Sequence, residues 1–305
     1  MAGPNESTGA ILAAFLANAG IAVAKFVGFL ITGSSSLLAE SIHSVADSGN
    51  QGLLFLGGRR AQRPPSPLHP FGYGRSRYFY AFVVAVVLFT VGGLFAIYEG
   101  WHKVSDPHDV TSPVVAFAIL GVAIGLETYA LRTAMKNSRA AKGRKGWVEF
   151  IRTSRSPELP VLLLEDSAAL IGLVFATAGI ALALLTGNPV WDGVGTLAIG
   201  VLLVLVAIVL ALEMHSLLIG EAADAPTLAK IESALTGGPE VRRLIHILTQ
   251  HLGPEELLVA AKLEFDPSLG VPELVAAIDA AERRVRTAVP IATLLYVEPD
   301  VVAPA

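Results

Sequence analysis

Apolar residues occur in six long runs over the first two thirds of the chain, separated by polar or glycine-containing segments. Two of these segments, residues 32–35 and 186–189, are so short that they predict tight turns between neighbouring helices. Each run is about 20 residues long, which is the length of an α-helix that crosses a bilayer. From about Gly220 the pattern changes, because charged residues recur every few positions and no later run reaches that length. We therefore expect six transmembrane helices, at residues 10–31, 36–56, 78–100, 113–135, 160–185 and 189–212.

The C-terminal part has the shorter patterns of a small α+β domain. Pro226 and Pro272 each begin an amphipathic helical pattern, and apolar runs at residues 244–248, 257–265 and 291–297 predict three strands. We expect a polytopic α-helical membrane domain at residues 1–219, followed by a cytoplasmic α+β domain at residues 220–305. A domain this small is near the lower limit for an independent core, so we expect it to pack against its own copy and make the protein a homodimer.

Composition supports the membrane interpretation and excludes several classes of function. Apolar residues make up 53% of the chain and charged residues 16%, and the mean hydropathy is +0.61. A soluble domain of this size would not remain in solution with that balance, so the lipid bilayer is the expected environment. The absence of cysteine excludes disulfides and thiolate metal ligands. A net charge of -4 without a basic domain gives no reason to expect a nucleic-acid partner.

Basic residues are concentrated in two of the connections between the apolar runs. The positive-inside rule places these two loops, and with them both termini, in the cytoplasm. We expect a multi-pass protein of the bacterial inner membrane in this orientation. The basic residues of the two loops are Arg59, Arg60, Arg63, Arg75 and Arg77, and Lys136, Arg139, Lys142, Arg144, Lys145, Arg152 and Arg155.

Ionisable residues within the apolar runs are the candidates for function, since a carboxylate at bilayer depth costs roughly 3 kcal/mol. On the second run four polar residues are spaced 3, 4 and 3 positions apart and so share one stripe of a helix: Glu40, His43, Asp47 and Asn50. The fifth run carries the adjacent carboxylates Glu165 and Asp166. If the second and fifth helices pack together, His43, Asp47 and Asp166 converge, and such a set binds a metal ion.

Each of these residues also has a structural interpretation. His43 and Asp47 could form a hydrogen bond that ties helices together, and Glu165 could serve an interhelical hydrogen bond instead of a metal. Lys25 and Glu127 could belong to a proton path or form a buried pair. Glu99 and Asp192, like Glu213 and His215, lie near the predicted ends of spans, where charges cost little, so we assign them no function. The outer-loop residues His102, Asp106, His108 and Asp109 are most simply a solvated polar loop.

Two motifs carry a resemblance to a known family. Residues 38–47 (LAESIHSVAD) and 69–74 (HPFGYG), together with six spans and an α+β tail, resemble the cation diffusion facilitator family of zinc and manganese exporters. Residues 47–54 (DSGNQGLL) and 162–169 (LLLEDSAA) are similar to the branch of that family that includes the mitochondrial zinc transporter of animals. The resemblance covers nearly the whole chain.

The resemblance implies a homodimer that exchanges a cytoplasmic divalent metal for protons by alternating access. It assigns metal ligands to His43, Asp47 and Asp166, and it places Leu162 where the family usually has a fourth ligand. Glu165, Asn50 or a water molecule must then complete the shell. In the tail, family zinc ligands fall near Lys262 and Tyr296, which cannot form a closed zinc shell, and His246 and His251 are loose candidates. We expect no tight zinc binding there.

The expected function is therefore proton-coupled export of a divalent metal, not an enzymatic reaction. One imidazole and two carboxylates, with a fourth oxygen, suit Zn²⁺ as the transported substrate, although Mn²⁺ or Fe²⁺ would also be accepted. Metal and H⁺ compete for the same groups, so H⁺ is the expected counter-ion. A membrane hydrolase would need a general base beside the metal, but the HExxH pattern is absent and Glu40 is the nearest candidate base. A metal-binding membrane scaffold is the remaining alternative.

Overall fold

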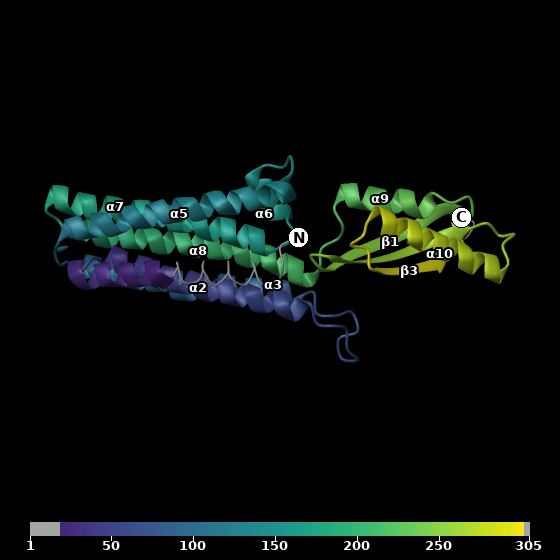
Figure 1. The fold of residues 1–305 in the computed structure, drawn as a ribbon, viewed down its shortest axis with the longest axis horizontal. Helices are drawn as coiled ribbons and strands as arrows, with labels where there is room; N and C mark the ends of the chain where they lie inside the picture. Colours follow the sequence, from purple (N-terminus) through teal and green to yellow (C-terminus); the bar gives the residue numbers. More distant parts are fainter. Residues whose placement is uncertain (1–18, 302–305) are drawn as a thin grey trace. The chain divides into compact units, whose positions relative to one another are not determined.

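The computed structural model describes residues 19–301 of the chain (Figure 1). The chain divides into two compact units, and each is considered separately below. One unit comprises the residues up to Gly58 together with Phe79–Met214. The other comprises Arg59–Tyr78 together with His215–Ala305.

The first unit consists of long helices whose axes lie side by side along a common line, as the labels α2, α3, α5, α7 and α8 in Figure 1 show. Its elements are a first helix described over Ala19–Thr32, α2 (Ser35–Ala61), a continuous helix over Ser76–Ser105, α5 (Pro113–Lys142), α6 (Trp147–Thr153), α7 (Glu158–Thr186) and α8 (Val190–Ile219). The short helix α6 lies in the second basic loop and was not predicted. Residues 10–18 of the first predicted span lie outside the described residues.

Four of these helices have the length and hydropathy of a membrane span, namely Ser76–Ser105, α5, α7 and α8. They make the chain a multi-pass membrane protein. Helix α2 is long enough but less apolar, because its sequence carries Ser35, Ser36, Glu40, His43 and Asp47 in its first half. All of these side chains except Asp47 are buried against protein, and Asp47 is partly buried, which is how a polar helix is accommodated in a helical membrane domain. The count of six spans stays a prediction.

The third span contains an irregularity that the sequence did not predict. Between α3 (Ser76–Val87) and α4 (Phe95–Ser105), residues Leu88–Leu94 form a π-helical segment, η1. It includes Gly93, where a Cβ atom would lie 2.7 Å from the side chain of Val204 on α8. The glycine therefore allows close approach of α8 at the position where the helical hydrogen-bond pattern widens.

Two tight turns join neighbouring helices of this unit, as the sequence predicted. The turn before α2 has Gly33 at φ +66°, and the turn between α7 and α8 has Gly187 at φ +64°. Glycine adopts this left-handed conformation without steric cost. Each turn therefore reverses the chain within a few residues, which places α7 and α8 as an antiparallel pair.

The second unit contains a three-stranded sheet with the order β1-β2-β3. Its elements are α9 (Ala225–Thr236), β1 (Val241–Gly253), β2 (Glu256–Phe265), α10 (Val271–Ala288) and β3 (Leu294–Pro299). β1 and β2 form an antiparallel hairpin, and β3 pairs parallel to β2. Both helices cover one face of the sheet, where Ile231, Leu263 and Val285 share a core. The prediction of a small α+β tail is confirmed.

The opposite face of the sheet carries an ionic cluster where the resemblance places zinc ligands. The Lys262 ammonium donates to Glu298 Oε1 at 3.1 Å and to Asp300 Oδ2 at 3.2 Å. These hydrogen bonds, with Glu298 first, raise the pKa of Lys262 above its ordinary value. His246 lies opposite Lys262 in the strand register. The positive charge that Glu298 and Asp300 contact is therefore the ammonium group of Lys262.

The loop between α2 and α3 belongs to the same unit as the tail. A Cβ atom at Gly74 would lie 2.5 Å from Glu256 Oε2 and 3.2 Å from the Cα atom of Gly253. The turn between β1 and β2 therefore touches the loop through two glycines, and a side chain at position 74 would not fit.

Candidate metal centre

The polar stripe predicted on α2 exists, and it is buried. Glu40, His43 and Asn50 are fully buried, whereas the side chain of Asp47 retains 15% of its exposure. The spacing of 3, 4 and 3 places these residues along one face of a regular α-helix, and that face packs against other helices of the unit.

His43 and Asp47 face each other but do not form a structural hydrogen bond. His43 Nε2 lies 3.6 Å from Asp47 Oδ2, which is beyond hydrogen-bond distance. Among the described residues, the two ring nitrogens of His43 and the Oδ1 atom of Asp47 have no hydrogen-bond partner. Buried polar atoms are nearly always satisfied in native proteins. These three atoms of His43 and Asp47 are exceptions, and atoms without hydrogen-bond partners are available to bind an ion.

A cavity of about 330 Å³ lies between four helices beside this pair. Four carboxylates line it, Asp47 from α2, Glu127 from α5, and Glu165 and Asp166 from α7. The other lining residues are Ile21, Ser44, Gln51, Leu126, Tyr129, Ala130, Thr133, Ala134, Asn137 and Leu162. The sequence did not single out Ser44, Gln51 or Asn137, although the first two lie next to the α2 stripe.

The two neighbouring carboxylates of α7 have different environments. Glu165 is buried and accepts a hydrogen bond of 2.6 Å from Asn50 Nδ2, whereas Asp166 is partly exposed in the cavity. Both residues line the cavity although α7 is α-helical from Glu158 to Thr186. Glu165 therefore reaches the cavity through its longer side chain, without a local distortion of α7.

The predicted ligands adjoin one cavity without forming a closed shell. Within residues 19–301, no three His, Asp or Glu side chains are close enough together to hold a metal ion. His43 is not among the lining residues of the cavity, and Asn50 is engaged with Glu165 through its amide. Leu162 lines the cavity and supplies no donor atom. A shell of His43, Asp47 and Asp166 would require movement of these side chains toward one another.

On its other side His43 faces the π-helical segment of the third span. A Cβ atom at Gly92 would lie 3.9 Å from His43 Nδ1 and 3.2 Å from Leu203 on α8. The absence of a side chain at residue 92 leaves room for the imidazole between two helices. π-helical turns occur frequently at functional sites, and this one lies against the central residue of the candidate site.

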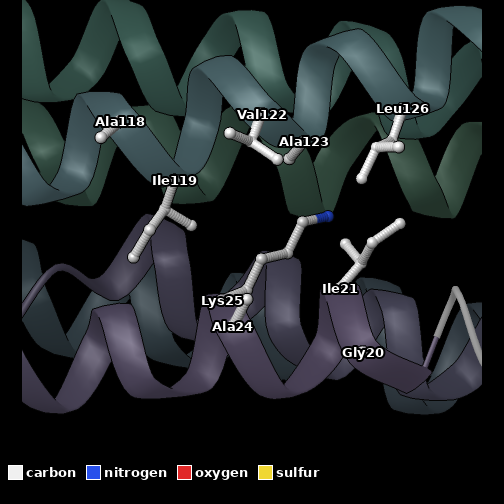
Figure 2. A pocket seen from close by; sticks show the side chains of 9 residues that line it. All are labelled: Gly20, Ile21, Ala24, Lys25, Ala118, Ile119, Val122, Ala123 and Leu126. Carbon is white, nitrogen blue, oxygen red and sulfur yellow. The ribbon is translucent and has the colours of Figure 1, made fainter.

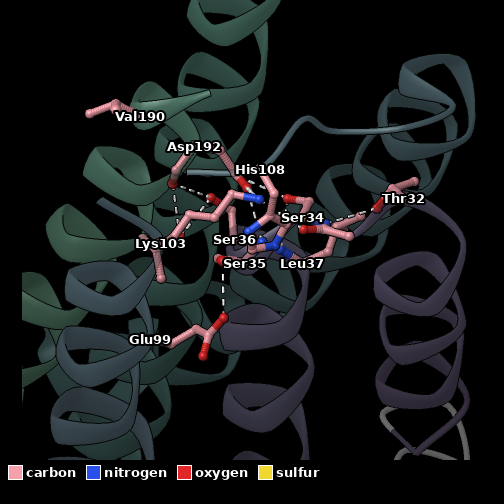
Figure 3. Close-up of polar contacts among 12 residues, drawn as sticks. Thr32, Ser34, Ser35, Ser36, Leu37, Glu99, Lys103, His108, Val190 and Asp192 are labelled. Carbon is pink, nitrogen blue, oxygen red and sulfur yellow. Dashed lines mark hydrogen bonds and ion pairs between the residues drawn. The ribbon is translucent and has the colours of Figure 1, made fainter. Parts of the chain in front are cut away.

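At the start of α2, a separate group of polar side chains is joined by hydrogen bonds (Figure 3). The carboxylate of Asp192 accepts hydrogen bonds of 2.9 Å from Ser34 Oγ and from the Ser35 amide at the start of α2. The Lys103 ammonium lies 3.8 Å from Asp192 Oδ2 and donates to Gly33 O at 3.1 Å. Both charged side chains are fully buried. Asp192 thus has structural contacts at the start of α2, which its position near a span end did not indicate.

The remaining sequence candidates do not form metal clusters. In the loop after α2, the rings of His69 and Tyr73 meet edge to face, with 4.7 Å between centroids. In the outer loop, His108 Nδ1 lies 3.1 Å from Asp106 O. In the tail, His251 is buried with Nδ1 3.4 Å from Gly253 O. Over the part of the chain that the structure describes, none of these histidines gathers two further ligand side chains.

Comparison with known proteins identifies several relatives of the chain. The chain is 32% identical to the mitochondrial proton-coupled zinc antiporter SLC30A9 of mouse and of human over 244 residues, which is 79% of this chain and 43% of each relative. It is 29% identical to metal tolerance protein C4 of Arabidopsis thaliana, over 81% of this chain and 54% of that protein. It is 28% identical to the zinc transporter ZitB of Pectobacterium atrosepticum, over 81% and 73%. The chain thus spans less than half the length of the SLC30A9 proteins.

A family model for the cation efflux transmembrane domain matches residues 11–219, which include the whole α2 stripe and both carboxylates of α7. The chain therefore belongs to the cation efflux, or cation diffusion facilitator, family of membrane transporters.

Proposed function

We propose that this transporter is a proton-coupled antiporter that exports zinc from the cytoplasm by alternating access. The observation that carries the proposal is the cavity lined by Asp47, Glu165 and Asp166 beside the unpaired imidazole of His43. We assign the transport site to His43, Asp47 and Asp166, completed by Glu165 and, through its free Oδ1 atom, by Asn50.

The competition between metal and protons provides the coupling. Metal ligands must be deprotonated, so binding of a divalent ion releases protons from the same imidazole and carboxyl groups. If the site opens alternately to each side, an ion leaving it is replaced by protons that return across the membrane. Imidazole and carboxylate oxygens suit Zn²⁺, and Mn²⁺ or Fe²⁺ are the alternative substrates.

The two ends of α2 support alternating access. The cavity residues Gln51 on α2 and Asn137 on α5 lie toward the ends of those helices that lead into the two basic loops. The Asp192 network closes the opposite end, where α2 begins. This arrangement fits an inward-facing state, since the positive-inside rule assigns the basic loops to the cytoplasm.

The organisation of the whole molecule is proposed on the same basis. We place six spans in residues 1–219 and a dimerisation domain in residues 220–305, with both termini cytoplasmic and the protein in a bacterial inner membrane. The exposed sheet face with Leu248 and Tyr296 is the surface offered for contact with a second copy.

Zinc flux into proteoliposomes, with and without an imposed pH gradient, tests the proposal. We expect Zn²⁺ uptake that depends on the gradient, with H⁺ moving the opposite way as reported by an internal pH dye. Competition by Mn²⁺ and Fe²⁺ in the same vesicles identifies the preferred substrate. Zinc binding without any flux would instead indicate a metal-binding scaffold.

A further inference from the structure

A second buried pair of charges lies one helical turn from the candidate transport site. The Lys25 ammonium, on the first helix, lies 2.9 Å from Glu40 Oε2 and donates a second hydrogen bond of 2.9 Å to Ser44 Oγ. Both charged side chains have no exposed surface. An isolated charge at this depth would be very costly, so each of the two depends on the other.

Glu40 has the position of an additional metal ligand. It lies three residues before His43 and therefore on the same face of α2. Its second oxygen, Oε1, has no hydrogen-bond partner among the described residues. That oxygen lies against α7, where a Cβ atom at Gly172 would be 2.5 Å from it. One carboxylate oxygen is thus held by lysine, and the other is unsatisfied.

Among the described residues, the cavity beside Lys25 is lined by no acidic side chain. Figure 2 shows its side chain reaching from the first helix toward α5 along a cavity of about 490 Å³. The rest of that lining is apolar: Gly20, Ile21, Ala24, Ala118, Ile119, Val122, Ala123 and Leu126. The ammonium is therefore directed to Glu40 and Ser44.

Electrostatics then determines the consequence for an ion in the site. The cavity is already lined by four carboxyl groups, and a Glu40 side chain released from Lys25 would add a fifth anionic ligand for a cation near His43. Charges at such distances in a protein interior interact strongly. A site with that excess would bind a divalent cation more tightly and release it more slowly.

We propose that Lys25 is a positioning residue that holds Glu40 out of the metal shell and thereby sets the affinity of the transport site. The ammonium acts as a tethered cation, so the transported ion meets the charge of the cavity carboxylates without that of Glu40. This proposal rests on the proposed function, because it concerns the same site.

The test measures zinc transport by the full-length protein in proteoliposomes, with KM and maximal rate determined separately. Lys25→Met frees Glu40, and we expect KM for zinc to fall about tenfold, with a lower maximal rate because release slows. Glu40→Gln leaves the ammonium uncompensated, and we expect KM to rise by a similar factor. The double variant Lys25→Met/Glu40→Gln should return KM to within about threefold of the wild type. Lys25→Arg should keep the wild-type KM.

A merely structural pair gives a different pattern. Loss of packing or folding would impair both single variants in the same direction, and equal signs of the two KM changes would overturn the proposal. An unchanged KM in Lys25→Met would also overturn it. The matched control is Lys103→Met, which breaks the other buried lysine pair and should leave KM unchanged in the folded fraction. Absence of zinc transport in the wild type would refute the proposed function instead.

Discussion

The start and the middle of α2 are both largely buried, but they differ in whether their polar groups form hydrogen bonds. At the start, Ser34, the Ser35 amide and Lys103 all reach Asp192, and each finds its partner within the bundle. In the middle, His43 and Asp47 face each other at 3.6 Å and leave three nitrogen or oxygen atoms without hydrogen bonds among the described residues.

The difference separates structural polar residues from candidate ligands. An unsatisfied buried polar atom costs on the order of 1–3 kcal/mol, so a stable protein keeps one only where something else depends on it. The start of α2 is a fixed joint between helices, with Asp192 serving as an N-terminal cap supplied by α8. Under the proposed function, the middle of α2 binds a metal ion and protons in turn.

The largest effect should come from removing a carboxylate of the middle region. Asp47→Ala and Asp166→Ala should each reduce zinc flux by at least about 100-fold, because each removes a proposed ligand for which the site has no substitute. Thermal unfolding in detergent should remain close to that of the wild type, since both side chains face the cavity. Ser48→Ala, on the same helix, is the control and should transport normally. Flux at the wild-type rate in either Asp variant would refute the site assignment.

The start of α2 should show the converse behaviour. Asp192→Ala should lower the free energy of unfolding by about 3–5 kcal/mol, because it leaves the buried Lys103 ammonium without a carboxylate. Chemical unfolding followed by tryptophan fluorescence measures this loss. Zinc affinity of the folded fraction should not change. If Asp192→Ala were as stable as the wild type but lost zinc affinity, the distinction between the two ends of α2 would be wrong.

The sequence predicted much of the fold because hydrophobic length and periodicity report directly on span position and on strands. It predicted the tight turns at Gly33 and Gly187 and the α+β tail. It did not predict the π-helical turn at Leu88–Leu94, since that turn depends on how α8 packs against Gly93. Local pattern cannot reveal a distortion that a neighbouring helix imposes.

The same limit applies to the site. The spacing of the α2 stripe predicted which face is polar, and Lys25 was recognised as a possible member of a buried pair. Its partner Glu40 and the role of Asp192 depend on contacts between residues 15 and more than 150 positions apart. Sequence position suggested that Asp192 was near water, whereas three-dimensional packing buries it.

A smaller effect is expected from the residue that lies between the two kinds of behaviour. Glu165 is buried and accepts a hydrogen bond from Asn50. Glu165→Gln should weaken zinc binding by about 10 to 100-fold if Glu165 lies outside the metal shell, and by more if it binds zinc directly as proposed, measured by competition with a zinc dye in detergent. Leu162→His in the Glu165→Gln background should restore part of the affinity, since it places an imidazole four residues before Asp166. Normal binding in Glu165→Gln would make Glu165 a structural residue and leave the remaining position to Asn50 or water.

The smallest effect concerns Glu256 in the tail, whose Oε2 atom also lacks a hydrogen bond among the described residues. Burial, and then repulsion from Glu255, raises the pKa of this carboxyl above its ordinary 4.5. The unfolded chain therefore loses its proton first as the pH rises, and the stability of the tail falls between the ordinary and the raised pKa. Glu256→Gln removes that loss and should stabilise the tail at pH 7 by about 0.5 kcal/mol, because the group is partly exposed and screened. Hydrogen exchange of β1 and β2 in the full-length protein measures the gain, which should vanish at pH 4. If Glu256→Gln stabilised the tail by as much as Asp192→Ala destabilises the membrane domain, an unpaired polar atom would cost the same free energy in both units. Unpaired polar atoms would then be a poor guide to the position of the site.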